Sequence, residues 1–245
     1  MGQDEWLIKS TQVGGLMPPT FFFGETMKIS VIMASYLGYY PNCADKREKR
    51  FIFSVNSFLK QTFKDAELVI VSDGCYLTEK IYNEKFKDKN NIKFIKIPKT
   101  EAFSGDSRNK GIEIAVGDFL CFLDSDDFFA EYHLERLNNQ IIEDMDWAYF
   151  DDYSYVAHNL FRKRKTGVLD SKERMVIGSC SIIYKRSIPI KWESGYGHDH
   201  VLIKKLIEKY KFVKFQIPSG YFVCHIPVPG PGFNVDKPTF GIISR

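Results

Sequence analysis

Residues 28–144 alternate between short apolar runs rich in β-branched side chains and longer stretches whose apolar residues recur at helical spacing. A short β-branched run is typical of a buried strand, and a repeat of three to four residues is typical of a helix. Strands that alternate with helices predict an α/β domain, with a mainly parallel sheet covered by helices on both faces. The expected strands are 28–35, 66–74, 91–97 and 118–124, and the expected helices are 47–63, 104–117 and 130–144.

The pattern changes after residue 144 and predicts a mixed sheet. The proline-rich tail, 227–245, is expected to be a loop. Residues 1–26 match nothing that follows, and we interpret them as a leader or an N-terminal extension. This leaves 27–226 as one domain. The further expected strands are 146–156, 159–169, 178–185, 211–217 and 220–226, and the further expected helix is 198–210.

The charge balance argues against a nucleic-acid-binding protein. Lys and Arg number 34 and Asp and Glu 31, and the net charge of +3 is too small for bulk binding to a phosphate backbone. Residues 1–26 carry three acids and one lysine, a net −2, so residues 27–245 carry +5, which suits an anionic small ligand. No apolar run approaches the ~18 residues of a transmembrane helix.

The five cysteines are scattered and form no CxxC pair. Free, buried thiols in a reducing compartment are the expectation for such a pattern. We therefore expect the chain in the cytoplasm, with the inner face of the membrane as an option.

Polar clusters follow three of the predicted strands. Ligands of open α/β sheets bind beyond the carboxyl ends of the strands. Three clusters at equivalent ends indicate one ligand site more strongly than any single motif does. They are Ala34-Ser35-Tyr36, Ser72-Asp73-Gly74 and Asp124-Ser125-Asp126.

The run CFLDSDDFF, residues 121–129, places three carboxylates in four positions, Asp124, Asp126 and Asp127. Like charges this close are costly unless a cation faces them. Carboxylate oxygens suit Mg²⁺ or Mn²⁺, which leaves room for phosphate oxygens in its coordination shell. The alternative is an Asx-turn or a helix N-cap before the following segment.

Four segments occur in an order that resembles the family-2 glycosyltransferases of the GT-A fold: SVIMASY, ELVIVSDGC, SRNKGIEIAVGDFLCFLDSDD and GHDHVLIKKL. The resemblance covers roughly residues 28–226 and is strongest over 104–128. It implies a mixed, mainly parallel GT-A sheet with a nucleotide-sugar half, 27–128, and an acceptor half, 129–226. It also implies a metal-assisted reaction that inverts the anomeric centre.

The resemblance implies a role for each matching residue. Ser35 and Tyr36 would line the base and ribose, and Asp73 would accept a hydrogen bond from the base. The other implied roles are Arg108 beside the base or diphosphate, Asp124 on the ribose or metal, Ser125 beside the nucleotide sugar, Asp126 and His225 on the metal, and Asp199 as the base that deprotonates the acceptor.

The sequence departs from the family pattern at Ala34, Ser72 and His198, where proline and two acids are usual. His198 and His200 could instead bind a metal beside Asp199, but adjacent helical side chains point about 100° apart and converge poorly. We favour Asp199 as the base. Acceptor-site candidates are Trp192, Tyr196 and His198, from their position near Asp199.

These features predict a glycosyltransferase that uses a nucleotide-sugar donor, with a UDP-sugar favoured and Mg²⁺ or Mn²⁺ as cofactor. A glycan or another hydroxyl compound would be the acceptor, in glycan or polysaccharide synthesis. Two alternatives stay open. One is a non-catalytic nucleotide-sugar or glycan-binding protein on the same fold, and the other is a nucleotidyltransferase.

Overall fold

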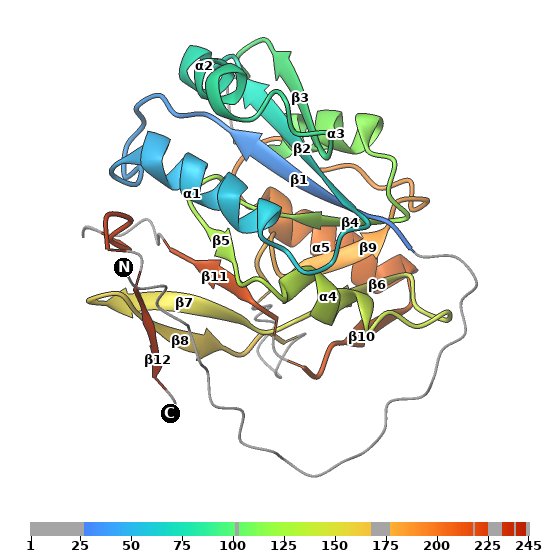
Figure 1. Ribbon diagram of the computed structural model, residues 1–245. Coiled ribbons are helices and arrows are strands. Elements are labelled where there is room, and N and C mark those ends of the chain that lie inside the picture. Colours follow the sequence, from blue (N-terminus) through green and yellow to red (C-terminus); the bar gives the residue numbers. More distant parts are fainter. Residues whose placement is uncertain are drawn as a thin grey trace.

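The computed structural model describes residues 27–100, 103–167, 177–217, 219–224, 232–237 and 239–243. Its main layer is a seven-stranded sheet in the order β10-β6-β9-β4-β1-β2-β3 (Figure 1). Strand β1 runs parallel to β2 and β4, β2 to β3 and β6 to β10, whereas β9 runs antiparallel between β4 and β6. The sheet is mixed and mainly parallel, which confirms the predicted class. The strands are β1 (Ile29–Ser35), β2 (Ala66–Asp73), β3 (Ile92–Ile97), β4 (Phe119–Phe122), β6 (Trp147–Tyr149), β9 (Ile182–Lys185) and β10 (Phe212–Lys214).

Helices cover both faces of this sheet. In Figure 1, α1 (Arg47–Leu59) and α2 (Tyr76–Lys85) lie in front of the sheet, and α3 (Gly105–Ile114) and α5 (His198–Lys209) lie behind it. Right-handed crossovers explain the placement, because β1, β2 and β3 progress in one direction and β4 returns to the other side of β1. The central strands are mainly apolar because both of their faces are buried.

Helix α3 lies close to the sheet because a glycine stands at the contact. A Cβ atom at Gly111 would lie 2.6 Å from Cγ2 of Ile32, inside van der Waals distance. The close approach sets the first turns of α3, with Arg108, against the carboxyl end of β4 and its following turn.

A second, five-stranded sheet has the order β12-β8-β7-β11-β5. Its aromatic core joins Phe128, Phe161, Phe222 and Phe233. Strand β11 runs antiparallel to β5, so this sheet attaches directly behind the acidic turn that precedes β5. The strands are β5 (Phe128–Phe129), β7 (Asp152–Ala157), β8 (Leu160–Arg164), β11 (Tyr221–Val223) and β12 (Gly241–Ile243).

Three elements differ from the sequence prediction. The tail contains β12, which pairs with β8, so the expectation of a loop over 227–245 was wrong for these residues. The helix expected over 130–144 is only α4 (His133–Asn138), because the run Asn138-Asn139 favours helix ends. Helix α2 was missed because only Thr78 and Ile81 are buried on it, which leaves a sparse apolar pattern.

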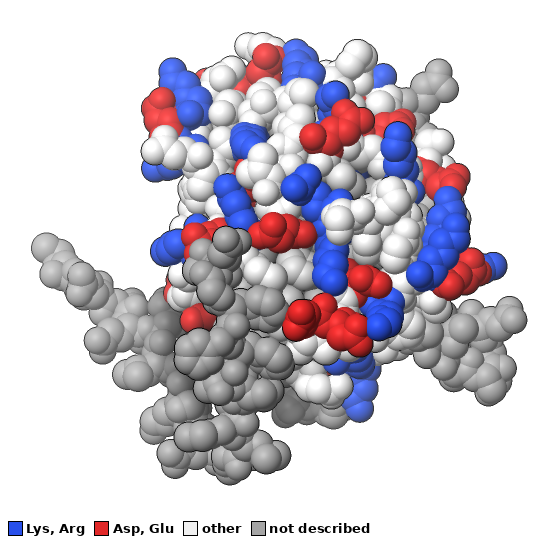
Figure 2. Space-filling view, turned by 90° about the vertical axis from the view of Figure 1, so that its right-hand side faces the viewer, with Lys and Arg blue, Asp and Glu red and all other residues white. Residues whose placement is uncertain are grey.

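None of the helices within the described ranges is long and apolar enough to cross a membrane. Figure 2 shows the side on which the chain enters β1, where Lys and Arg side chains alternate with Asp and Glu. Residues 1–26, whose origin was one of the predictions, lie outside the described residues.

Candidate active site

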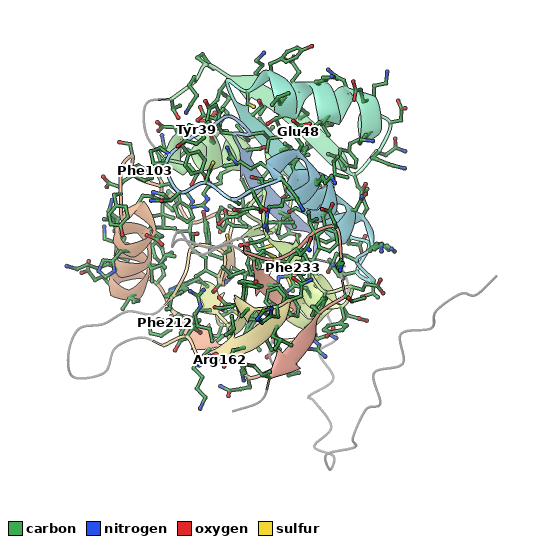
Figure 3. The ribbon with its side chains drawn as sticks, turned by 90° about the vertical axis from the view of Figure 1, so that its left-hand side faces the viewer. Tyr39, Glu48, Phe103, Arg162, Phe212 and Phe233 are labelled. Atoms are coloured by element: carbon green, nitrogen blue, oxygen red, sulfur yellow. The ribbon has the colours of Figure 1, made fainter. Side chains whose placement is uncertain are left out.

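The polar clusters predicted at the strand ends lie along one edge of the main sheet, on the side that Figure 3 faces. Strands β1 and β2 are parallel neighbours and end at Ser35 and Asp73. Asp124 follows β4, the other parallel neighbour of β1. The backbone of Asp124 is fixed on both sides, because its C=O accepts from Ser54 Oγ at 3.1 Å and its N–H donates to Tyr221 Oη at 3.2 Å.

Arg108 connects α3 to the acidic turn. Its guanidinium is buried, and Nη2 lies 2.7 Å from Asp124 Oδ1 and 3.2 Å from Ser179 Oγ. The same group stands 4.5 Å from the centre of the Trp192 ring, a cation–π contact. Burial alone lowers the pKa of Arg108, but the Asp124 carboxylate more than offsets this and raises it, so the guanidinium stays charged.

His198, the first residue of α5, is the third hydrogen-bonding partner of Arg108, after Asp124 and Ser179. Its Nδ1 lies 2.9 Å from the Gly195 carbonyl oxygen, so this nitrogen carries the hydrogen and donates. Nε2 then accepts from Arg108 Nη1 at 3.0 Å. The helix begins after Gly197, whose φ of 78° suits glycine, and Asp199 is the next residue in the first turn. The contact between His198 and Arg108 therefore brings the start of α5 to the acidic turn.

Asp127 anchors the acidic turn through contacts inside the protein. It is buried, and its two oxygens accept from Tyr221 Oη and from the Cys224 N–H, each at 2.7 Å. Burial raises the pKa of Asp127 well above its usual range, and the charges of Asp126 and Asp124 raise it further. The negative charge that acts on Asp127 comes from Asp126 and Asp124, where the family resemblance places a metal.

The carboxylates suit a hard divalent cation. Asp124 and Asp126 are half-buried with Ser125 between them, and oxygen donors that are few in number are what Mg²⁺ and Mn²⁺ accept beside phosphate. The pKa of Tyr40 is raised, mainly by burial. The charge of Arg47 lowers it, and the charges of Asp126 and Asp124 raise it. Within the described part of the chain, no three His, Cys, Asp or Glu residues group as a ready metal site. His225, the predicted third ligand, lies outside the described residues.

Asp73 ends β2 and Tyr36 follows the neighbouring strand β1; the family resemblance assigns both to the nucleotide base. The carboxylate of Asp73 accepts from the Thr100 N–H at 2.7 Å and lies 2.6 Å from Lys99 Nζ. This ammonium also stands over the Tyr36 ring, 4.4 Å from its centre. Lys99 thus contacts two of the candidate residues, and the sequence analysis missed it because a lone lysine after a strand carries no recognisable signal.

Two serines of the predicted clusters are structural. The Ser35 hydroxyl is buried and shares a hydrogen bond with Thr78 Oγ1 at 3.0 Å. Ser72, which replaces an acid of the family pattern, donates to the Cys75 C=O at 3.0 Å and accepts from the Cys75 N–H at 3.2 Å. Their side chains build the turns that present the site. A ligand contact from Ser35 can come only from its backbone.

The acceptor candidates separate into a buried and an exposed residue. The Trp192 side chain packs on Phe122 at 4.9 Å between ring centres and is 3% exposed, so its ring does not stand open to an acceptor. It supports Arg108 instead. Tyr196 is 94% exposed and its ring lies 6.0 Å from that of Phe103, which Figure 3 labels on the same side of the molecule. Tyr196 stays an acceptor candidate.

A family comparison matches residues 30–189 to the model of "Glycosyl transferase family 2". Among curated proteins, the Uncharacterized glycosyltransferase YibD of Escherichia coli is 27% identical over 193 residues, which are 75% of this chain and 52% of that protein. The chain thus spans about half the length of this relative, and smaller shares of others.

Solved structures show the same fold. TarS 1-349 from Staphylococcus aureus in complex with UDP-GlcNAc aligns with a TM-score of 0.62 at 23% identity, over 80% of this chain and 58% of that chain. The mannosyltransferase PcManGT from Pyrobaculum calidifontis, in complex with GDP-Man and Mn²⁺, aligns with a TM-score of 0.58 at 12% identity, over 85% and 59%. The architecture described above is therefore the GT-A fold.

Proposed function

The chain belongs to glycosyl transferase family 2, and from this premise we propose that it is a metal-dependent inverting glycosyltransferase. It would move a sugar from a UDP-sugar to the hydroxyl group of an acceptor, in the synthesis of a glycan or polysaccharide. The observation that carries the proposal is the chain of contacts from Asp124 through Arg108 to His198. It joins the acidic turn of the donor half to the helix start of the acceptor half.

The donor class follows from relatives whose complexes are known. TarS was solved with UDP and with UDP-GlcNAc, which supports a UDP-sugar here. PcManGT was solved with GDP-Man and Mn²⁺, which supports a divalent cation as cofactor. It also leaves a GDP-sugar as an alternative donor for this chain. Asp126 and Asp124 are the residues that would hold the cation. Once bound, it would neutralise charge on the departing diphosphate.

Asp199 is the proposed base. In one displacement, an acceptor oxygen forms a bond to the sugar anomeric carbon while the bond from that carbon to the diphosphate breaks. The acceptor proton goes to the Asp199 carboxylate, and the nucleotide diphosphate leaves with the bonding electrons. Attack from the face opposite the leaving group inverts the anomeric centre. Asp199 lies in the first turn of α5, where its Oδ1 accepts from the His200 N–H at 2.9 Å.

Arg108 acts through its neighbours. All its described contacts are to protein groups, and it is too buried to be a first point of contact for a donor. By holding Asp124 and His198 at once, it would fix the separation between the donor side and the base. We therefore assign it as a positioning residue.

A panel of nucleotide sugars with Mn²⁺ tests the proposal. Release of free UDP from a UDP-sugar, with no pyrophosphate from UTP and a sugar phosphate, is the expected result. Pyrophosphate release would indicate the nucleotidyltransferase alternative. Tight donor binding with no turnover in the presence of many acceptors would indicate the binding-protein alternative.

A further inference from the structure

Lys99 stands between the two side chains that the family resemblance assigns to the base end of the donor, Tyr36 and Asp73. Its ammonium contacts the Asp73 carboxylate, faces the Tyr36 ring and donates to the Thr100 C=O at 2.8 Å. An ammonium has three N–H donors. The two hydrogen bonds within the described residues leave one donor, and the Lys99 side chain is 46% exposed.

The local backbone fixes this position. The Gly74 N–H donates to the Ile97 C=O at 2.9 Å, and Pro98 then turns the chain over the end of β2. Gly74 has a φ of +61°, and a Cβ atom there would lie 2.7 Å from the Lys99 Cβ. Only glycine allows Lys99 to pass this close. The ion pair with Asp73 is therefore built into the edge of the sheet.

We propose that Lys99 and Asp73 together select the nucleotide base. The inference rests on the proposed function, because it requires a nucleotide donor at this edge. The ammonium donates to a ring carbonyl of the base, and the carboxylate accepts the neighbouring ring N–H. Uracil, thymine and guanine carry this C=O and N–H pair, whereas cytosine and adenine carry an unprotonated ring nitrogen beside an amino group.

The pair makes Lys99 a specificity-determining residue. An acid alone accepts equally from a ring N–H and from an amino group, so Asp73 by itself separates keto from amino bases poorly. A fixed cation beside it adds a donor, which a carbonyl oxygen accepts and which an amino group in the same place cannot accept. A site built to hydrogen-bond one edge of a base discriminates against a base that leaves one of its polar groups unpaired.

Calorimetric titration of the full chain with UDP and with CDP, in Mg²⁺, tests the proposal. The unaltered protein should bind UDP at least about tenfold more tightly than CDP. Lys99→Met keeps the aliphatic stem and should weaken UDP binding by about tenfold or more while CDP affinity stays within about twofold. Lys99→Arg keeps a cationic donor and should retain most of the preference.

Lys96→Met is the matched control. Lys96 is 42% exposed and pairs with Glu79 at 2.6 Å on the preceding strand, so its loss should change neither affinity. Circular dichroism checks that each variant is folded. UDP binding to Lys99→Met as tight as before, or tighter, would overturn the proposal, as would equal affinity of the unaltered protein for UDP and CDP. If that protein bound neither, the proposed function would fall as well.

Discussion

Arg108 and Asp124 form an ion pair in which one partner is almost fully buried and the other is open to a ligand. Nη2 and Oδ1 are 2.7 Å apart, and the two side chains are 3% and 38% exposed. The pair ties helix α3 to the turn after β4, while Nη1 of the same arginine holds His198 on α5. One buried cation thus contacts both the turn after β4 and the start of α5.

Replacement of Arg108 by Met should therefore affect stability and turnover together. Loss of one partner from a buried pair leaves Asp124 and His198 without their donor, which costs roughly 2–3 kcal/mol of unfolding free energy given the partial exposure of Asp124. Turnover should fall at least ~10²-fold because the positions of both groups loosen. Urea unfolding and steady-state kinetics measure the two effects.

Lys110→Met is the control on the same helix. Lys110 pairs with Glu113 at the surface, with side chains 40% and 56% exposed, and such pairs contribute little. An Arg108→Met protein that matched Lys110→Met in both measurements would contradict the positioning role.

The acidic turn predicts a metal requirement. Donor binding and turnover should need Mg²⁺ or Mn²⁺, and Asp126→Ala should abolish turnover while the protein still folds, because the remaining carboxylate holds the cation poorly. Titration calorimetry of UDP with and without metal measures the binding part. Asp144→Ala is the control, because Asp144 is an exposed acid that pairs with Lys211 at the surface. Full activity in excess chelator would rule the metal role out.

His133 predicts a loss of stability in acid. Burial lowers its pKa from 6.5 to about 3, with the charge of Arg136 as a smaller cause, and its Nδ1 accepts from the Gly220 N–H at 3.0 Å. Below pH 6.5 this histidine binds a proton in the unfolded chain but not in the folded chain. The unfolding free energy therefore falls as the pH drops toward 3. Urea unfolding between pH 8 and pH 4.5 measures the slope.

His133→Asn keeps an acceptor for Gly220 and removes the titration, so its slope should be shallower although the protein is less stable at pH 8. His158→Asn is the control, because His158 is exposed with a φ of 50° that asparagine tolerates. Equal slopes for the unaltered protein and His133→Asn would show that this histidine is not the cause.

The position of Asp199 in α5 allows a role as base to be separated from a role in the helix start. The residue before the helix is Gly197, which has no side chain to cap it. Among the residues that the structure describes, the Asp199 carboxylate accepts only from the His200 N–H, at 2.9 Å. Asn can keep this contact but cannot take a proton. Asp199→Asn should therefore lower turnover at least ~10²-fold with donor affinity unchanged. Glu208→Gln, exposed on the same helix, should be silent; similar turnover in both variants would remove Asp199 as the base.

The fold was predictable where both faces of a strand are buried. β1, β2 and β4 are mainly apolar runs, and a polar cluster that the structure places at one edge stands at the end of each. β12 and α2 were not predictable, because β12 depends on pairing with β8, far away in sequence, and α2 buries few side chains.

The candidate site was predictable by residue type and less so by contact. Asp124 and Arg108 were singled out from their motifs, but the motifs do not say that the two side chains pair. Nearness of Trp192 to Asp199 in sequence does not reveal that its ring is buried against Arg108. Lys99 depends on a turn permitted by Gly74, a three-dimensional coincidence of segments about 25 residues apart.

The most direct test of inverting glycosyl transfer uses water as the acceptor, so no acceptor needs to be known. The full chain is incubated with a UDP-α-sugar and Mn²⁺, and ¹H NMR records UDP and the first-formed sugar before its anomers equilibrate. The account predicts UDP together with the β-anomer, both absent from the Asp199→Asn protein. First formation of the α-anomer, or no UDP from any UDP-sugar, would contradict it.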